Sequence, residues 1–142
     1  MRLLIINGPN INLLGSREIN IYGELNYNSL KNTLKDYAAK RNIELDIYQS
    51  NYEGEIVEKI QKANTFDGII INAGAYTHTS IAIRDALLAI NKPFVEIHIS
   101  NVFKRESFRQ RSFLSDIAVG IICGFGLKSY ILAIKYFELE EI

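Results

Sequence analysis

The chain has 142 residues, of which 48% are hydrophobic, and its 16 lysine and arginine residues balance 16 aspartate and glutamate residues. This length and composition predict one domain, residues 1–142, with a buried core. The balanced charge argues against binding to nucleic acid or to an anionic membrane surface. A single cysteine excludes a disulfide framework, and no apolar stretch is long enough for a signal peptide or a membrane span. We therefore expect a cytoplasmic protein.

The first predicted elements surround a long loop. Residues 3–6 form an apolar run that predicts a buried strand, and the run ends at a polar turn from Asn7 to Asn10. The connection around residues 15–27 has the length of an active-site lid, a binding loop or a poorly ordered surface excursion. A helix follows, with Asn28 or Ser29 as its N-cap. Its buried face is predicted to consist of Leu30, Leu34, Tyr37 and Ala38.

The remaining predicted strands alternate with helices. Residues 45–48 alternate between apolar and polar side chains, which predicts an edge strand. A second helix with Ile56 and Ile60 on its buried face is predicted to end at Asn64. Apolar runs predict three further strands, and apolar faces predict two further helices. These strands are expected at residues 69–71, 94–100 and 119–123, and the helices at residues 81–90 and 127–137.

Five strands that alternate with helices predict an α/β fold with a parallel sheet. Right-handed crossovers leave few topologies, and the strand order 2-1-3-4-5 with helices on both faces is the leading choice for this length. This order places the first and third strands side by side. Their polar turns, which carry Asn10 and Asn72, should therefore flank the switch point at which a ligand binds, with His78 close by.

The fourth strand carries two ionisable residues. With a period of two, Glu96 and His98 share one face of an inner strand, and Ser100 follows on the same face. Two ionisable residues are unfavourable there unless they have partners. They could form a buried pair that only fixes packing. Alternatively, Glu96 orients the imidazole of His98 and favours its protonated form, which would make His98 a general acid at the carboxyl end of the strand.

Two groups of residues, each with at least one arginine, could complete a site. Arg105 and Arg109 would share a face if their segment is helical, where they could bind a carboxylate in bidentate fashion or simply be solvated. In the predicted lid, Arg17 and Tyr22 form a second possible pair. An arginine close to a tyrosine lowers the pKa of the phenol and makes it a better base.

Other classes of site fail on specific residues. The turn after residues 3–6 lacks the Gly-Lys pair of a P-loop and the glycine fingerprint of a dinucleotide-binding fold. A phosphoacceptor receiver domain would have an aspartate where Asn72 stands. The two histidines have no third ligand at a suitable spacing, so no metal site is expected.

Three long motifs cover most of the chain. The first runs from Asn7 to Glu18 and continues at Tyr22-Gly23, and the second runs from Asn72 to Ser80 and continues at Arg84-Asp85-Ala86. The third runs from Pro93 to Asn101 and continues at Arg105-Glu106-Ser107-Phe108-Arg109. Together they resemble the type II 3-dehydroquinate dehydratases. The resemblance implies a flavodoxin-like three-layer fold and an enzyme of the shikimate pathway, which removes water from 3-dehydroquinate to give 3-dehydroshikimate. It also implies a cofactor-independent anti elimination through an enolate.

The resemblance implies roles for individual residues. Tyr22 would take the C2 proton, with its pKa lowered by Arg17, and His98 would protonate the departing hydroxyl group. Asn10 would help to position a water molecule that stabilises the enolate oxygen. Other residues would bind the substrate hydroxyl groups and carboxylate or support those that do. These are Asn72, His78, Arg109 and the backbone at Ile99 and Ser100, with Glu96 and Arg105 in support.

The resemblance further implies a homododecamer, a tetramer of trimers, in which Asp85 is lent to the site of a neighbouring subunit. The alternative from another class is a catalytically silent flavodoxin-like assembly or binding module. The presence of Arg17, Tyr22 and His98 argues against that alternative.

Overall fold

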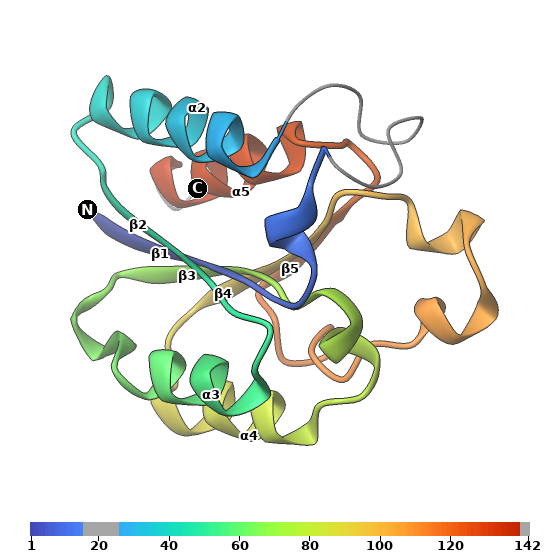
Figure 1. Ribbon diagram of the computed structural model, residues 1–142. Helices are drawn as coiled ribbons and strands as arrows, with labels where there is room; N and C mark the ends of the chain where they lie inside the picture. Colours follow the sequence, from blue (N-terminus) through green and yellow to red (C-terminus); the bar gives the residue numbers. More distant parts are fainter. Residues whose placement is uncertain (16–25, 140–142) are drawn as a thin grey trace.

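The computed structural model describes residues 1–15 and 26–139 of the chain. Within these residues, five parallel strands form one sheet in the order β2-β1-β3-β4-β5 (Figure 1). The strands are β1 (Arg2–Asn7), β2 (Glu44–Gln49), β3 (Gly68–Asn72), β4 (Phe94–His98) and β5 (Gly120–Cys123). The α-helices of the described residues are α2 (Tyr27–Ala39), α3 (Glu53–Gln61), α4 (Ile81–Ile90) and α5 (Lys128–Glu138). The predicted flavodoxin-like α/β fold and its strand order are confirmed.

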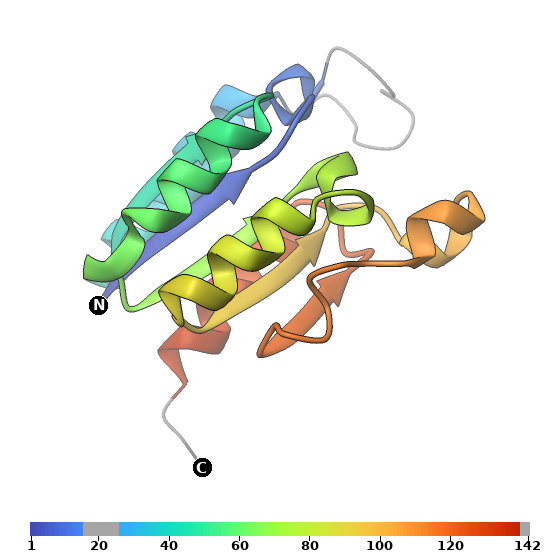
Figure 2. The same ribbon diagram turned by 90° about the horizontal axis from the view of Figure 1, so that it is seen from below.

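The sheet is covered on both faces. Helices α2 and α5 lie on one face, and α3 and α4 lie on the other (Figure 1). Figure 2 shows α3 and α4 side by side across their face of the sheet. Side chains alternate along the inner strands, so Leu3 and Ile5 pack toward α2 and α5, whereas Leu4 and Ile6 pack toward α3 and α4. This two-sided burial explains why the inner strands are almost wholly apolar.

The N-cap of the first helix lies two or three residues before the predicted cap. It is Asn26, not Asn28 or Ser29. The Asn26 side chain accepts a hydrogen bond from the Ser29 backbone N–H at 2.8 Å, and the Ser29 hydroxyl accepts one from the Asn26 N–H at 3.1 Å. This reciprocal pair is a capping box, which satisfies two N–H groups at the start of the helix. Ser29 therefore supports the cap from inside the helix.

Three other predicted boundaries shift by a few residues. Strand β4 ends at His98, not Ser100, because its partner β5 ends opposite it at Cys123. Strand β5 begins at Gly120. Helix α3 ends at Gln61, before the predicted end at Asn64, and a short 3-10 helix, η2 (Ala63–Thr65), follows. The predicted edge strand and the helix at residues 81–90 are confirmed.

The turns after β1 and β3 meet at the carboxyl edge of the sheet. The Gly8 N–H donates to the Asn72 carbonyl oxygen at 2.8 Å. A Cβ at position 8 would lie 2.2 Å from the Ala73 carbonyl oxygen, so this close approach requires glycine. Gly74 has a φ of 59°, which also favours glycine. The turns lead into two 3-10 helices, η1 (Ile11–Leu13) and η3 (Gly74–His78).

Part of the predicted lid, residues 16–25, lies outside the described residues, and with it lie Arg17 and Tyr22. No helix within residues 1–15 and 26–139 combines the length and the apolar character that a membrane crossing requires.

Candidate active site

A cavity of about 150 Å³ lies at the carboxyl edge of the sheet. It is formed by the turns after β1 and β3 and by the segment that follows β4. Eight of the residues predicted for the site line it: Asn10, Asn72, His78, His98, Ile99, Ser100, Arg105 and Arg109. The strand order brings them together, because parallel strands present all their carboxyl ends at one edge.

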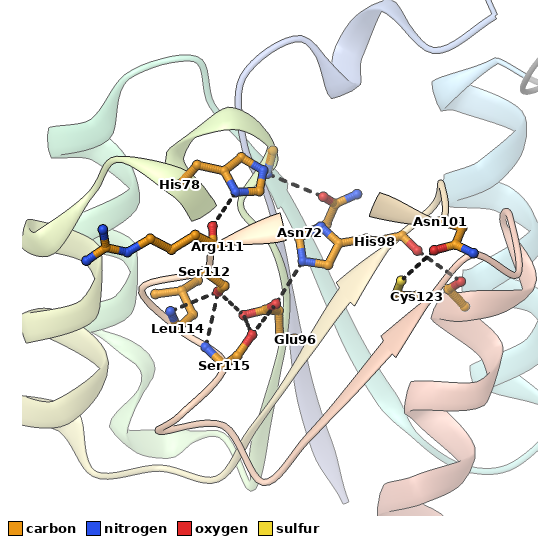
Figure 3. Close-up of polar contacts among 12 residues, drawn as sticks. Asn72, His78, Glu96, His98, Asn101, Arg111, Ser112, Leu114, Ser115 and Cys123 are labelled. Atoms are coloured by element: carbon orange, nitrogen blue, oxygen red, sulfur yellow. Dashed lines mark hydrogen bonds and ion pairs between the residues drawn. The ribbon is translucent and has the colours of Figure 1, made fainter. Parts of the chain in front are cut away.

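Glu96 and His98 form a buried, hydrogen-bonded pair, which fits both interpretations of their spacing in the sequence. The His98 Nε2–H donates to Glu96 Oε2 at 2.8 Å, and the two residues are only 7% and 2% exposed (Figure 3). Burial raises the pKa of the Glu96 carboxyl. Hydrogen bonds from His98, Ser112 and Ser115, together with the imidazole charge, more than offset this effect and hold the pKa below its usual value. Because Nε2 is used in this bond, Nδ1 is the ring nitrogen left for a ligand.

Two serines that the sequence reading missed also bind Glu96. Ser112 Oγ donates to Oε1 at 2.7 Å, and Ser115 Oγ donates to Oε2 at 2.9 Å (Figure 3). The predicted buried carboxylate requires such donors. Residue spacing does not say which of the hydroxyl groups in the chain supply them.

His78 is oriented by Arg111, which directly precedes Ser112 in the chain. Its Nδ1 lies 2.6 Å from the Arg111 carbonyl oxygen. A carbonyl oxygen only accepts, so Nδ1 carries the proton and Nε2 is left for another partner. The rings of His78 and His98 stack with centroids 6.3 Å apart. Both histidines therefore lie in one wall of the cavity with defined orientations.

Asn72 is held by a series of buried hydrogen bonds. Its Nδ2 donates to the Tyr130 hydroxyl at 3.1 Å, and that hydroxyl donates to Asn7 Oδ1 at 2.6 Å. Its Oδ1 accepts from the Gly74 N–H at 3.3 Å. Tyr130 is fully buried at the start of α5. Asn7 and Tyr130 thus support the site without lining its cavity, and the sequence reading had assigned neither of them to it.

Asn10 adopts the left-handed backbone conformation, with a φ of 68°, which asparagine tolerates better than most residues. Its N–H donates to Asn51 Oδ1 at 3.0 Å, and Gln49 Nε2 donates to the same oxygen at 3.1 Å. Tyr76 holds Asn51 from the other side through a 2.6 Å bond to its carbonyl oxygen. The turn after β1 is therefore tied to the turns after β2 and β3.

Arg105 and Arg109 line the cavity, although the helix that would have paired them is absent from this described segment. Two short 3-10 helices, η4 (Val102–Lys104) and η5 (Ser107–Gln110), replace it. Arg105 Nη1 donates to the Ser100 hydroxyl at 3.3 Å. Arg109 Nε pairs with Glu106 at 2.5 Å, which lowers the pKa of the Glu106 carboxyl. Two guanidinium groups at the cavity suit a carboxylate ligand.

Asp85 lies away from the cavity of its own chain. It is exposed on the outer side of α4, where it lies between the exposed apolar side chains of Ile81 and Leu88. Within the described part of the chain, no three His, Cys, Asp or Glu side chains form a group that could hold a metal ion.

The fold and cavity define a class of protein: an open α/β protein with a small cavity at the carboxyl edge of its sheet, lined by histidine and arginine side chains that suit a carboxylate ligand. A profile of the family described as Dehydroquinase class II matches residues 1–138. The chain belongs to this family.

Individual relatives agree with the family. The 3-dehydroquinate dehydratase of Prochlorococcus marinus subsp. pastoris is 57% identical over 136 residues, which cover 95% of this chain and 93% of the relative. That of Francisella philomiragia subsp. philomiragia is 58% identical over 134 residues, with 94% and 92% covered. The crystal structure of the type II dehydroquinase from Butyrivibrio crossotus matches with a TM-score of 0.95 at 51% identity and covers 98% of both chains.

Proposed function

We propose that this chain is a 3-dehydroquinate dehydratase, a hydro-lyase that removes water from 3-dehydroquinate to give 3-dehydroshikimate. Family membership along residues 1–138 and the names of its relatives support this function. The observation that carries it is the cavity that brings the paired His98 together with Asn72, His78 and Arg109. These groups provide a proton donor, hydroxyl-binding partners and a carboxylate-binding cation for one small ligand.

His98 is the general acid of the proposed mechanism. In the proposed acid step the ring is an imidazolium, and the Glu96 carboxylate accepts its Nε2–H. The proton on Nδ1 is then available to the C1 hydroxyl group as the C–O bond breaks. The imidazole of His98 returns to its neutral form, and the protonated hydroxyl group leaves as water. A positioned acid of this kind typically contributes about 10² to 10⁴ in rate.

The base of the proposed mechanism is Tyr22. Its phenolate takes the proton at C2, next to the ketone, and the electron pair moves into an enolate. Arg17 favours the phenolate by its charge. An anti elimination needs base and acid on opposite faces of the substrate ring, and a tyrosine from the predicted lid and a histidine from a strand end can supply them.

The remaining residues bind and orient the substrate. Arg109, supported by Arg105, is assigned to the carboxylate. Asn72, His78 and the backbone at Ile99 and Ser100 are assigned to hydroxyl groups and the carboxylate, and Asn10 to the water that stabilises the enolate oxygen. The proposed reaction uses neither a cofactor nor a metal ion.

The direct test is an ultraviolet assay for the conjugated enone product. Purified protein is mixed with 3-dehydroquinate in buffer that contains a chelator and no added cofactor. Steady formation of the enone supports the function. Absence of the enone at every protein concentration would refute it and would favour the binding-module alternative.

Replacing Arg109 by alanine should raise KM by about ten- to a hundredfold, with a smaller effect on kcat. Its proposed partner is a carboxylate that keeps its charge throughout the reaction, so the interaction is equally strong in the substrate and the transition state. Steady-state kinetics measure the effects on KM and kcat separately. Lys104→Ala, which removes an exposed cation outside the cavity, is the matched control. A normal KM with a collapsed kcat would instead assign Arg109 to catalysis.

We further propose that the active unit is a homododecamer, a tetramer of trimers. The outer side of α4 supports an interface, because Ile81 and Leu88 are 57% and 51% exposed there in the single chain. Asp85 shares that side and lies outside its own cavity, as expected of a residue that completes a neighbour's site.

Asp85→Ala should therefore lower activity and loosen the assembly together. Sedimentation at micromolar concentration should show the parent as a multiple of three chains of 16.2 kDa. Asp36→Ala, at an exposed position on α2, should change neither property. A parent that sediments as a fully active monomer would overturn the shared site.

A further inference from the structure

The Glu96 carboxylate, on strand β4, has hydrogen-bond donors at both of its oxygens. It is 2% exposed and accepts hydrogen bonds from His98, Ser112 and Ser115 (Figure 3). Both serines come from the segment between η5 and β5, which we call the serine segment (residues 111–116). Neither serine lines the cavity at the carboxyl edge, whereas both line the larger cavity beside it together with Glu96 and His98.

The geometry of Ser112 gives its hydroxyl group a single direction. Its oxygen accepts the backbone N–H groups of Leu114 at 3.0 Å and Ser115 at 3.1 Å. A hydroxyl group has one proton to donate, and with its oxygen occupied in this way that proton points to Glu96 Oε1. The Ser115 hydroxyl lies 3.1 Å from Oε1 and 2.9 Å from Oε2, so it bridges both oxygens.

The serine segment is anchored at points beyond the two serines. The Phe113 N–H donates to the Thr77 carbonyl oxygen at 2.9 Å, and the Phe113 carbonyl oxygen accepts from Arg84 at 2.7 Å. Arg84 also pairs with Asp116, and the Leu114 side chain is fully buried. The hydroxyl groups are thereby held in place by η3 and α4. The same segment orients His78 through the Arg111 carbonyl oxygen.

Other charged or titratable groups of the described residues lie near Glu96 without binding its carboxylate. His78, Arg109, Cys123, Lys135 and Tyr136 line a larger cavity beside it. Among the described residues, the Glu96 carboxylate has hydrogen bonds or ion pairs only with His98, Ser112 and Ser115. Arg84 and Asp116 neutralise each other at the far end of the segment.

We infer that Ser112 and Ser115 are positioning residues for the acid step: their hydroxyl groups keep Glu96 ionised and aimed at His98 Nε2. An unsupported buried carboxylate would gain a proton or turn toward other donors, and the imidazolium would lose its partner. The catalytic part of this inference rests on the proposed dehydratase function. The ionisation part does not, because it can be measured without substrate.

Ser115→Ala is the cleanest test, because Ser112 still holds the backbone of the segment when the Ser115 hydroxyl is gone. The lost donor favoured the charged carboxylate, so its removal should raise the titration midpoint of Glu96 by about one pH unit. Carbon-13 NMR of labelled glutamate carboxyl groups measures this midpoint, with Glu96→Gln to assign the signal. Ser115→Thr, which keeps the hydroxyl group, should titrate like the parent.

Kinetics provide the second measurement. Ser115→Ala should lower kcat about tenfold with KM nearly unchanged, and it should have no further effect in a Glu96→Gln background. Ser129→Ala is the matched control. It removes a buried hydroxyl that donates to the His98 carbonyl oxygen at 3.3 Å and not to its ring, so the Glu96 midpoint should stay unchanged.

Two results would overturn the inference: a Glu96 midpoint that does not move in Ser115→Ala, or a loss of kcat that is equally large with and without Glu96. If Ser115→Ala does not fold, Ser115→Cys, whose thiol is a weak donor, is measured in the same way. A parent protein that fails to dehydrate 3-dehydroquinate would refute the proposed function, whereas the NMR titration would still decide whether the serines keep Glu96 ionised.

Discussion

Replacing His98 by asparagine should lower kcat by about 10² to 10⁴-fold, because the variant loses the proposed proton donor to the leaving hydroxyl group. Asparagine is polar and smaller than histidine, so it fits the space at the end of β4 without overpacking. The fold should therefore persist, and the ultraviolet assay measures the loss directly. Glu96→Gln should cause a smaller loss, because the imidazole remains but its charged partner is gone.

Thermal unfolding and circular dichroism are the controls for the His98 variant. Circular dichroism should match that of the parent, whereas the melting temperature should fall, because the variant leaves the buried Glu96 carboxylate without its His98 donor. If His98→Asn keeps about a tenth or more of the parental kcat, the general acid is another group. His78, whose ring stacks on that of His98, would then be the first replacement to examine.

Replacing Tyr22 by phenylalanine should remove nearly all turnover, again by about 10² to 10⁴-fold, while leaving substrate binding largely intact. The change deletes only the phenolic oxygen that accepts the C2 proton. Arg17→Ala should also cost most of the rate, because the phenolate loses a favourable charge. Steady-state kinetics, together with calorimetric binding of substrate to the inactive Tyr22 variant, separate the two effects.

Other tyrosines provide the comparison for Tyr22. Tyr52, which is 69% exposed, should tolerate phenylalanine with no change in kcat. Tyr27 is the last residue of the predicted lid, and burial raises the pKa of its phenol above the usual value even though a hydrogen bond with Asn7 opposes the rise. A raised pKa makes Tyr27 a poor base at neutral pH. A Tyr22→Phe enzyme with near-parental kcat would therefore require a base of another kind.

The sequence by itself determined the strands of the sheet and the placement of Glu96 and His98 on one face of the fourth strand. Buried parallel strands need apolar residues on both faces, so the runs at residues 3–6 and 69–71 could be read locally. The alternation at residues 94–100 placed Glu96 and His98 on one face for the same local reason. Strand order then followed from chirality and length, and it brought Asn10 and Asn72 to one edge.

Local patterns were less reliable at element ends and in the segment after β4. The spacing of Arg105 and Arg109 was read as a possible helical face, yet Arg105 lies between two 3-10 helices. Hydroxyl and amide side chains cluster around residues 26–29, and only the formed capping box distinguishes Asn26 from its neighbours. Several sites satisfy the same local rule in such places, and packing selects among them.

Only the tertiary structure decided which residues support the site from behind. Glu96 meets Ser112 and Ser115 across 16 and 19 residues, and Tyr130 meets Asn7 across 123. These partners belong to no periodic pattern. A hydrogen bond depends on distances and angles that the packing of distant segments sets, whereas burial of a strand or helix face leaves a repeating signal in the order of residues.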